Sequence, residues 1–275
     1  GVLPGNVVNN ASLVFNRSNA LTFAGAISGT GSVTQAGTGV LTLTGANSYS
    51  GGSIVTSGIL AAGSDGVLGA PSSGLTLNGG TFRYLSAFGL GAGRAVSVGG
   101  SGGTIDTQGF ATTIGGAITG SGALTKTGTG SLTLTGNSSY SGNTTVAQGT
   151  LQLGNGGTSG SVQGNIQLNA GTGLVLNRSD SFTLPGNITG TGAVNKTGAG
   201  TAILTGNNSY TGGTTITQGA LQIGNGGTAG ALTGNVTNNG RLVFNRSDAV
   251  SFGGTISGTG SVTQAGSGVL TLTAD

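Results

Sequence analysis

The chain has 275 residues, of which 62 are Gly, 8 are Lys or Arg and 5 are Asp, and it contains no His, Cys, Met or Glu. The net charge of +3 is spread along the sequence, so there is no basic stripe to follow nucleic-acid phosphates. Gly costs about 1 kcal/mol per helical position relative to Ala, whereas the recurring Thr, Val and Ile favour strands, so helices are not expected.

The N-terminal segment 5–23 (GNVVNNASLVFNRSNALTF) is a lead-in that returns at 164–184 and at 234–252. Each copy carries an Asn-Arg-Ser triplet, with its Arg at 17, 178 and 246. An Asp follows the second and third Arg by two residues, at 180 and 248. We expect local surface ion pairs here, and a ladder of ligand-binding Arg is the alternative.

A Gly-rich block follows each lead-in. It runs over 25–60, returns over 116–154 and 186–224, and begins again at Gly254. The step from Tyr140 to Tyr210 is 70 residues, so lead-in and block form a cassette of that length. We expect one β-helix fragment of a longer chain, with cassettes at 1–60, 61–154, 155–224 and 225–275.

The segment between Leu60 and Gly116 is different and longer. The step from Gly25 to Gly116 is 91 residues, some 21 to 23 more than the other steps. That excess equals one turn of a three-sided coil with strands of about 3–5 residues. The sequence therefore predicts one extra coil within 61–154.

The predicted fold is all-β: a right-handed parallel β-helix (three-sided β-solenoid) with about 20–25 residues per coil. Nine short strands per cassette, divided by Gly-rich bends, predict three coils of three strands. Apolar side chains alternate toward the interior and polar ones toward solvent. The bend glycines, expected to need positive φ, include Gly31, Gly122, Gly192 and Gly260.

The block GTGSVTQAGTGVLTLTGANSYSGGSIVTSGIL resembles the passenger-associated transport repeat, also called the autotransporter-associated β-strand repeat. The matching features are Gly-x-Gly-x-(Leu/Val)-x-(Lys/Gln), Leu-Thr-Leu-Thr-Gly, Asn-Ser-Tyr-(Ser/Thr)-Gly and the Leu-Gln-(Leu/Ile)-Gly ending. The first copy departs from the pattern, with Gln35 for Lys and Ala61-Ala62 in its ending.

This resemblance implies a passenger domain of a type V secreted protein, exported through an outer-membrane β-barrel of the same polypeptide to the bacterial cell surface. In that family the repeat is associated with passenger secretion and folding. The resemblance implies no cofactor and no nucleic-acid partner.

We expect no catalytic, cofactor or metal residues. The segment 99–103 (GGSGG) matches the Gly-x-Ser-x-Gly nucleophile pattern, but no His is available as base, so a bend is expected. Thr104 stands where a calcium-binding nonapeptide needs Asp. The longer cassette is the candidate binding region, and solvated corners are the alternative. Its candidate residues are Asp65, Arg83, Tyr84, Arg94 and Asp106.

Tyr49, Tyr140 and Tyr210 recur at equivalent positions. We expect them to pack at corners, and an aromatic platform for sugars is the alternative.

Two functions remain open at this point. The first is a structural stalk that supports adhesion to host or abiotic surfaces, or self-association, including end-to-end stacking into a filament. The second is a glycan- or host-protein-binding module that uses segment 61–116.

Overall fold

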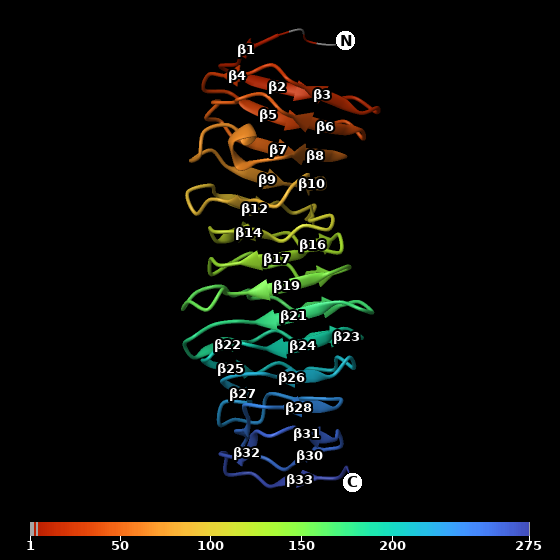
Figure 1. Cartoon of the computed structure of the whole chain (residues 1–275), viewed down its shortest axis with the longest axis vertical. Coiled ribbons are helices and arrows are strands. Elements are labelled where there is room, and N and C mark those ends of the chain that lie inside the picture. The colour runs from red at the N-terminus through yellow and green to blue at the C-terminus, as the bar shows by residue number, and fades with distance from the viewer. Residues whose placement is uncertain (1–2, 4, 275) are drawn as a thin grey trace. The chain divides into compact units, whose positions relative to one another are not determined.

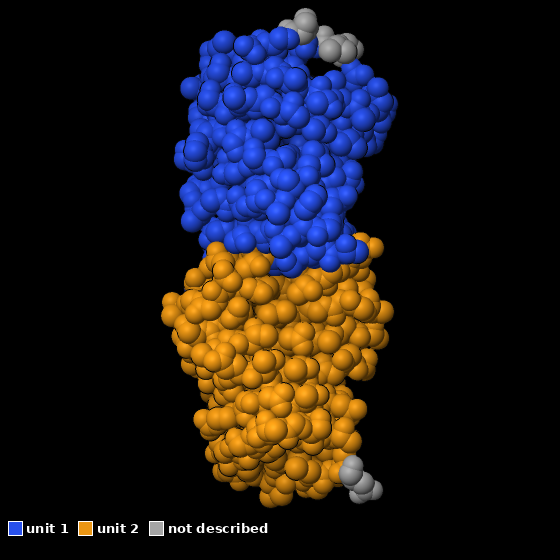
Figure 2. Space-filling model, viewed as in Figure 1, with its two compact units in different colours: residues 1–132, 136–142 blue, residues 133–135, 143–275 orange. Residues whose placement is uncertain are grey.

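The computed structural model describes residue 3 and residues 5–274. It divides into two compact units, which are described separately (Figure 2). The first unit comprises residues 1–132 and 136–142, and the second comprises residues 133–135 and 143–275. β17 (Ser131–Leu134) contains the boundary between them.

The first unit has three faces of parallel strands, and the chain visits them in turn (Figure 1). One sheet contains β2 (Ser12–Phe15), β5 (Ser32–Gln35), β7 (Ser53–Val55), β9 (Leu75–Leu77), β12 (Val96–Val98) and β15 (Ile118–Gly120). The next contains β3 (Leu21–Phe23), β6 (Val40–Leu43), β8 (Ile59–Ala62), β10 (Thr81–Tyr84), β13 (Gly103–Asp106) and β16 (Leu124–Thr127). The third face holds β1 (Val7–Val8), β4 (Ile27–Ser28), the 3-10 turn η1 (Asp65–Leu68), β11 (Gly89–Leu90) and β14 (Thr112–Ile114).

The second unit repeats this plan. One face contains β19 (Thr150–Leu153), β21 (Gly173–Leu176), β24 (Ala193–Lys196), β26 (Thr214–Ile216), β28 (Val236–Asn238) and β31 (Ile256–Ser257). The next contains β22 (Phe182–Leu184), β25 (Thr201–Leu204), β27 (Ala220–Ile223), β29 (Arg241–Phe244) and β32 (Ser261–Gln264). The last holds β18 (Thr144–Val146), β20 (Ile166–Leu168) and β23 (Ile188–Gly190), and further along the chain β30 (Val250–Phe252) and β33 (Leu270–Leu272).

The pairing register gives the size of a coil. Val40 pairs with Ile59, 19 residues on, and Thr81 pairs with Thr104, 23 residues on. Each strand is hydrogen-bonded in parallel to the strand one coil away. This confirms the predicted three-sided parallel β-solenoid, and its coils are at the short end of the predicted range.

The prediction of three whole coils per cassette is wrong, because some sides lack a strand. From β23 to its sequence equivalent β31 the chain passes eight strands and two strandless sides, which makes ten sides, or three coils and one side. Accordingly β24 lies in the sheet of β21 and β26, whereas its equivalent β32 lies in the sheet of β27 and β29. Equivalent positions in successive cassettes therefore lie on successive faces.

The longer spacing in the first unit keeps the same phase. From β4 to β15 the chain passes eleven strands and two strandless sides, which makes thirteen sides, or four coils and one side. The difference from ten sides is one coil. The cassette boundaries at residues 60, 154 and 224 stay a prediction.

The core lies inside the coils. Strands such as β5 and β6 alternate half-buried and buried residues, and the buried positions are mostly Leu, Val, Ile and Phe. Apolar burial of this kind contributes about 25 cal/mol per Å². Within the described residues, no helix has the length and apolar character needed to cross a membrane.

Candidate functional site

The tyrosines of the repeated block are enclosed in the core. Tyr49, Tyr140 and Tyr210 are fully buried. The Tyr49 hydroxyl lies 2.6 Å from Ser53 Oγ, and the Tyr210 hydroxyl lies 2.6 Å from Thr214 Oγ1. Burial raises the pKa of Tyr49 to about 12. A ring with no exposed surface cannot stack on a sugar, so these residues pack corners.

The Asn two residues before the Tyr ties three coils together. Asn47 Oδ1 accepts from the Ile27 amide at 2.8 Å, and Asn47 Nδ2 donates to the Val67 carbonyl at 2.6 Å. Asn208 makes the same pair of contacts, at 2.8 Å to Ile188 and 2.9 Å to Ala231. Our sequence analysis missed this role, although its signal is the position of this residue in the Asn-Ser-Tyr motif.

The glycine pairs of the block are needed for two different reasons. The first of each pair has positive φ, as in Gly29 at 99° and Gly190 at 100°. Gly31 and Gly192 do not, but a Cβ added to them would lie 2.4 Å and 2.6 Å from backbone oxygens of the adjacent coil. Gly122 and Gly260 are equally close, at 1.8 Å and 2.3 Å. The second glycine therefore permits coil stacking, which corrects our expectation that it needs positive φ.

Two lysines point into the core. Lys126 is fully buried, and its Nζ donates to Thr107 Oγ1 at 2.8 Å and to the carbonyls of Thr127 at 3.0 Å and Gly128 at 2.8 Å. Lys196 is also fully buried and donates to the carbonyls of Gly198 and Gln218.

Glutamine does the same work in the other copies. Gln35 Nε2 donates to the carbonyls of Gly37 at 2.7 Å and Gly39 at 3.0 Å. Gln264 bonds Gly266 and Gly268 in the same way. The chain thus supplies its own neutral substitute for the buried Lys. The strict alternation of Leu124, Thr125 and Lys126 is the signal that could have placed this Lys inside.

The buried lysines predict an unusual pH dependence. Burial lowers the pKa of Lys126 and Lys196 from 10.5 to about 8. Between pH 8 and pH 10.5 the unfolded chain therefore binds more protons than the folded chain, so the free energy of unfolding rises with pH. The expected slope is up to about 1.4 kcal/mol per pH unit for each Lys, measured by urea denaturation.

The double substitution Lys126→Gln and Lys196→Gln is the matched control and should remove this rise. The buried tyrosines act in the opposite direction: above their ordinary pKa of 10, only the unfolded chain ionises, and stability falls. A flat profile between pH 8 and pH 10 in the unsubstituted protein would contradict the assignment.

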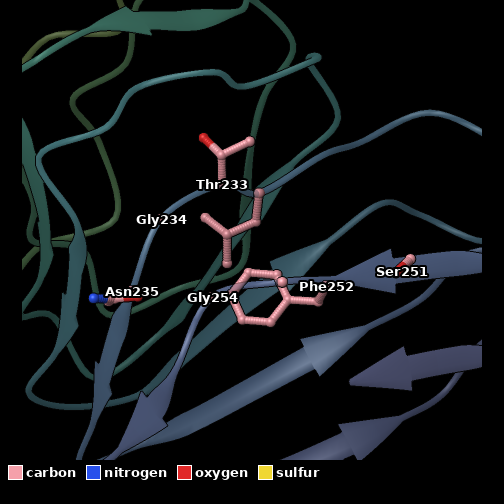
Figure 3. A pocket seen from close by; sticks show the side chains of 8 residues that line it. Thr233, Gly234, Asn235, Ser251, Phe252 and Gly254 are labelled. Atoms are coloured by element: carbon pink, nitrogen blue, oxygen red, sulfur yellow. The ribbon is translucent and has the colours of Figure 1, made fainter. Parts of the chain in front are cut away.

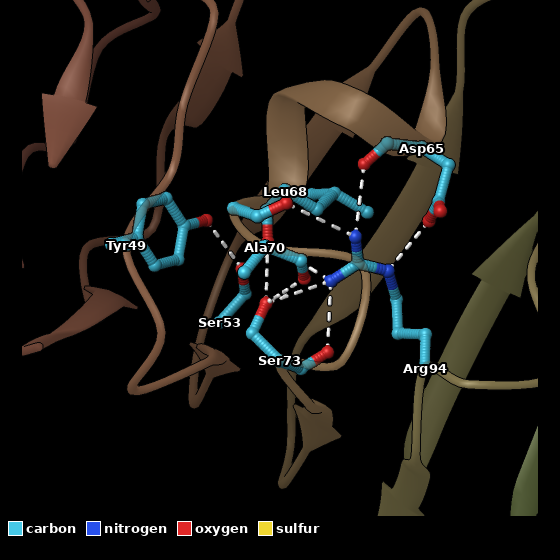
Figure 4. A network of polar contacts seen from close by, with 8 residues as sticks. Tyr49, Ser53, Asp65, Leu68, Ala70, Ser73 and Arg94 are labelled. Atoms are coloured by element: carbon cyan, nitrogen blue, oxygen red, sulfur yellow. Dashed lines mark hydrogen bonds and ion pairs between the residues drawn. The ribbon is translucent and has the colours of Figure 1, made fainter.

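Among the candidate residues of the longer cassette, Arg94 and Asp65 meet at η1 (Figure 4). Arg94 is fully buried, and its Nε lies 2.5 Å from Asp65 Oδ1. Its Nη1 donates to the Ser73 and Leu68 carbonyls at 2.8 Å and 3.0 Å, and its Nη2 donates to the Asp65 carbonyl at 3.1 Å. The guanidinium clamps the one 3-10 turn among the described residues, so Arg94 is not at a solvated corner.

Arg83 and Asp106 form a separate cluster, on neighbouring strands β10 and β13. Arg83 Nε lies 2.9 Å from Asp106 Oδ2, and the Gln108 amide donates to Asp106 Oδ1 at 2.9 Å. Burial works to raise the pKa of Asp106, but the hydrogen bonds from Gln108 and Arg83 outweigh it and hold the pKa below its usual value. Gln108 has φ of 52°, in the left-handed region that favours glycine. Arg83 keeps 31% of its side chain exposed.

Tyr84 belongs to neither cluster. It is buried between the rings of Phe82 and Phe88, at centroid distances of 4.9 Å and 4.6 Å. The five candidate residues are therefore divided among an internal clamp, an outer ion pair and the aromatic core, and they do not form one groove.

The segment 99–103 is a turn. The Gly102 amide donates to the Gly99 carbonyl at 2.8 Å, and the Ser101 amide donates to Asn78 Oδ1 at 3.0 Å. The expected bend is confirmed.

The lead-in arginines make the expected ion pairs and also bond a loop. Arg178 Nη2 lies 2.7 Å from Asp180 Oδ2 and 2.5 Å from the Thr158 carbonyl. Arg246 pairs with Asp248 at 2.5 Å and donates to the Gly230 carbonyl. Each Arg therefore holds an exposed loop of the preceding coil, at residues 154–160 or 224–230.

A pocket of about 290 Å³ lies in the second unit, between residues 232–235 and 251–254 (Figure 3). Leu232 and Phe252 form its apolar wall. Thr233 and Asn235 line it as well, but they already bond the backbone of Tyr210 and Thr255, at 2.8 Å and 3.1 Å. No charged side chain lines this pocket. The described residues contain no group of three or more His, Cys, Asp or Glu that could hold a metal ion.

These features define a β-solenoid repeat protein in which the buried polar groups join one coil to the next. The passenger-associated transport repeat family matches residues 33–62, 124–153 and 194–223. These segments run from β5 to β8, from β16 to β19 and from β24 to β27.

The adhesin BmaC autotransporter of Brucella suis biovar 1 (strain 1330) is 52% identical over 83 residues. The similarity covers 28% of this chain and 2% of that protein. No solved structure matches. The chain carries the repeats of an autotransporter passenger, and such repeats indicate export to the cell surface.

Proposed function

We propose that the chain is a non-enzymatic stalk within the passenger of a surface autotransporter. The observation that carries the proposal is the use of its polar side chains. Arg94, Lys126 and Lys196 are fully buried and bond coil to coil or clamp a corner, which leaves Arg241 as the one exposed basic side chain among the described residues. Groups consumed by stacking serve a scaffold and not a reaction centre.

In this role the coils hold other parts of the passenger away from the cell and support adhesion or self-association. The outer-membrane barrel of the same polypeptide is the proposed export partner. The relative named as an adhesin supports the adhesive context.

The test removes one coil from the exported protein. Residues 96–117 form a whole coil, because Val96 and Ile118 are register partners. We expect the deletion to leave the amount on the cell surface and the adhesion of the cells unchanged, because a stalk shortened by one coil keeps its phase. Loss of adhesion at unchanged surface amount would refute the stalk and favour a binding role for this segment.

The second candidate is a binding role for the cluster of Arg83, Asp106 and Gln108. The left-handed Gln108 favours it, since strained backbone gathers at functional sites. The double variant Arg83→Ala and Asp106→Asn tests this role on a glycan array and on host-cell extracts. Binding that survives the double substitution would exclude the cluster.

A further inference from the structure

The two exposed loops of the second unit share a chemically labile pair. Asn155 is followed by Gly156, and Asn225 by Gly226, and all four residues are exposed. An Asn before Gly is prone to deamidation, because glycine has no Cβ to hinder attack of its own amide nitrogen on the Asn side chain.

The reaction needs no partner but water. The Gly156 nitrogen forms a bond to Asn155 Cγ, the Cγ–Nδ2 bond breaks, and ammonia leaves. Water then opens the resulting succinimide to aspartate or isoaspartate, which adds one negative charge. The backbone nitrogen must first lose its proton and turn toward Cγ.

In this structure both nitrogens are held elsewhere. The Gly156 amide donates to the Asn177 carbonyl at 2.9 Å, and the Gly226 amide donates to the Asn245 carbonyl at 2.8 Å. A proton engaged in such a bond is harder to remove, and the bond fixes the nitrogen away from the attack. Opening of the loop must therefore precede the reaction.

The Asn-Arg-Ser triplet of the next coil supplies the rest of the restraint. The Ser179 amide donates to the Gly157 carbonyl at 2.9 Å, and the Ser247 amide donates to Gly227 at the same distance. Arg178 bonds the Thr158 and Gly160 carbonyls, at 2.5 Å and 3.4 Å. Each residue of the triplet thus holds one part of the loop.

The other two Asn-Gly pairs of the chain follow the same rule. The Gly79 amide, after Asn78, donates to the Gly102 carbonyl at 2.7 Å. The Gly240 amide, after Asn239, donates to Asn238 Oδ1 at 3.2 Å.

We propose that Asn155 and Asn225 are deamidation sites, and that the Asn-Arg-Ser segments 177–179 and 245–247 are latches that keep them unreacted. The latch explains why the triplet recurs with the loop. It gives a long-lived surface protein resistance to chemical ageing at its most exposed glycine-rich loops.

The test compares two single variants of the whole chain, Arg178→Ala and Arg246→Ala. The proteins are aged in mildly alkaline buffer, and peptide mapping by mass spectrometry quantifies aspartate and isoaspartate at both sites. We expect Arg178→Ala to accelerate deamidation of Asn155 about tenfold, the factor for losing hydrogen bonds to a charged group, and to leave Asn225 unchanged. Arg246→Ala should show the reverse, so each variant controls for the other.

The unsubstituted protein in urea gives the unprotected rate. Arg178→Lys keeps the charge but loses the planar fork, so we expect an intermediate rate at Asn155. Three results would overturn the proposal: equal rates in the folded and urea-unfolded protein, no change at Asn155 in Arg178→Ala, or equal acceleration of both sites in one variant.

Discussion

Replacing Tyr210 by Ala should destabilise the second unit by about 3–5 kcal/mol, the range for removing a fully buried aromatic side chain. The ring is enclosed at a corner, and its hydroxyl shares a hydrogen bond with the buried Thr214. The Ala variant leaves both a cavity and an unpaired hydroxyl. Urea denaturation measures the loss, and hydrogen exchange locates it, since opening can be local in a repeat protein.

Tyr210→Phe is the matched control. It keeps the ring and removes only the hydroxyl, so the expected loss is about 1–3 kcal/mol from the hydrogen bond and the unpaired Thr214. A loss below about 1 kcal/mol for the Ala variant would show that the corner can collapse around the cavity, contrary to a tightly stacked coil.

Replacing Arg94 by Ala should cost the first unit about 3–5 kcal/mol, because one partner of a buried ion pair is removed. Asp65 loses its counter-charge, and the Leu68 and Ser73 carbonyls lose their donor. We expect the loss of protection against hydrogen exchange to centre on η1 and on the strands on either side of it, β8 and β9.

Arg241→Ala is the control for removal of a positive charge. Arg241 is exposed, and substitutions at such positions usually change stability by less than about 0.5 kcal/mol. Equal losses for Arg94→Ala and Arg241→Ala would mean that the clamp at η1 contributes nothing.

The fold was accessible from the sequence because period and composition agree. Alternation of Leu and Thr in segments such as 40–44 places one side chain inside and the next outside, and the regular Gly-rich bends set the coil. The 21 to 23 extra residues of the longer cassette match a coil in length.

The phase of the cassettes was not accessible, because strandless sides leave no mark of their own. Residues 207–211 contain no strand, yet the Ser209 amide bonds the Ile188 carbonyl at 2.9 Å and completes a side. A count of apolar runs misses such a side, and the cassette then closes one side too early.

The interior polar groups were missed for a related reason. Lys126 and Lys196 are charged residues at inward positions, and their partners are backbone carbonyls that no sequence pattern marks. The pairing of Arg94 with Asp65 across 29 residues depends on the path of the chain around η1, so it was visible only in the structure.

The central claim is that the chain folds as interchangeable coils whose phase is counted in three sides. Deletion of residues 96–117 from the purified chain removes β12, β13 and β14, and Ile118 then takes the place of Val96 beside Leu75. Deletion of residues 107–117 removes β14 alone and leaves the count one side short.

Hydrogen exchange over β9, β10, β15 and β16 distinguishes the two deletions most directly. We predict that the deletion of 96–117 keeps these strands protected, because each inward side chain still meets an inward neighbour. The deletion of 107–117 should expose them, because the next strand reaches the wrong face. Equal protection in both variants, or loss of protection in the whole-coil deletion alone, would contradict the account.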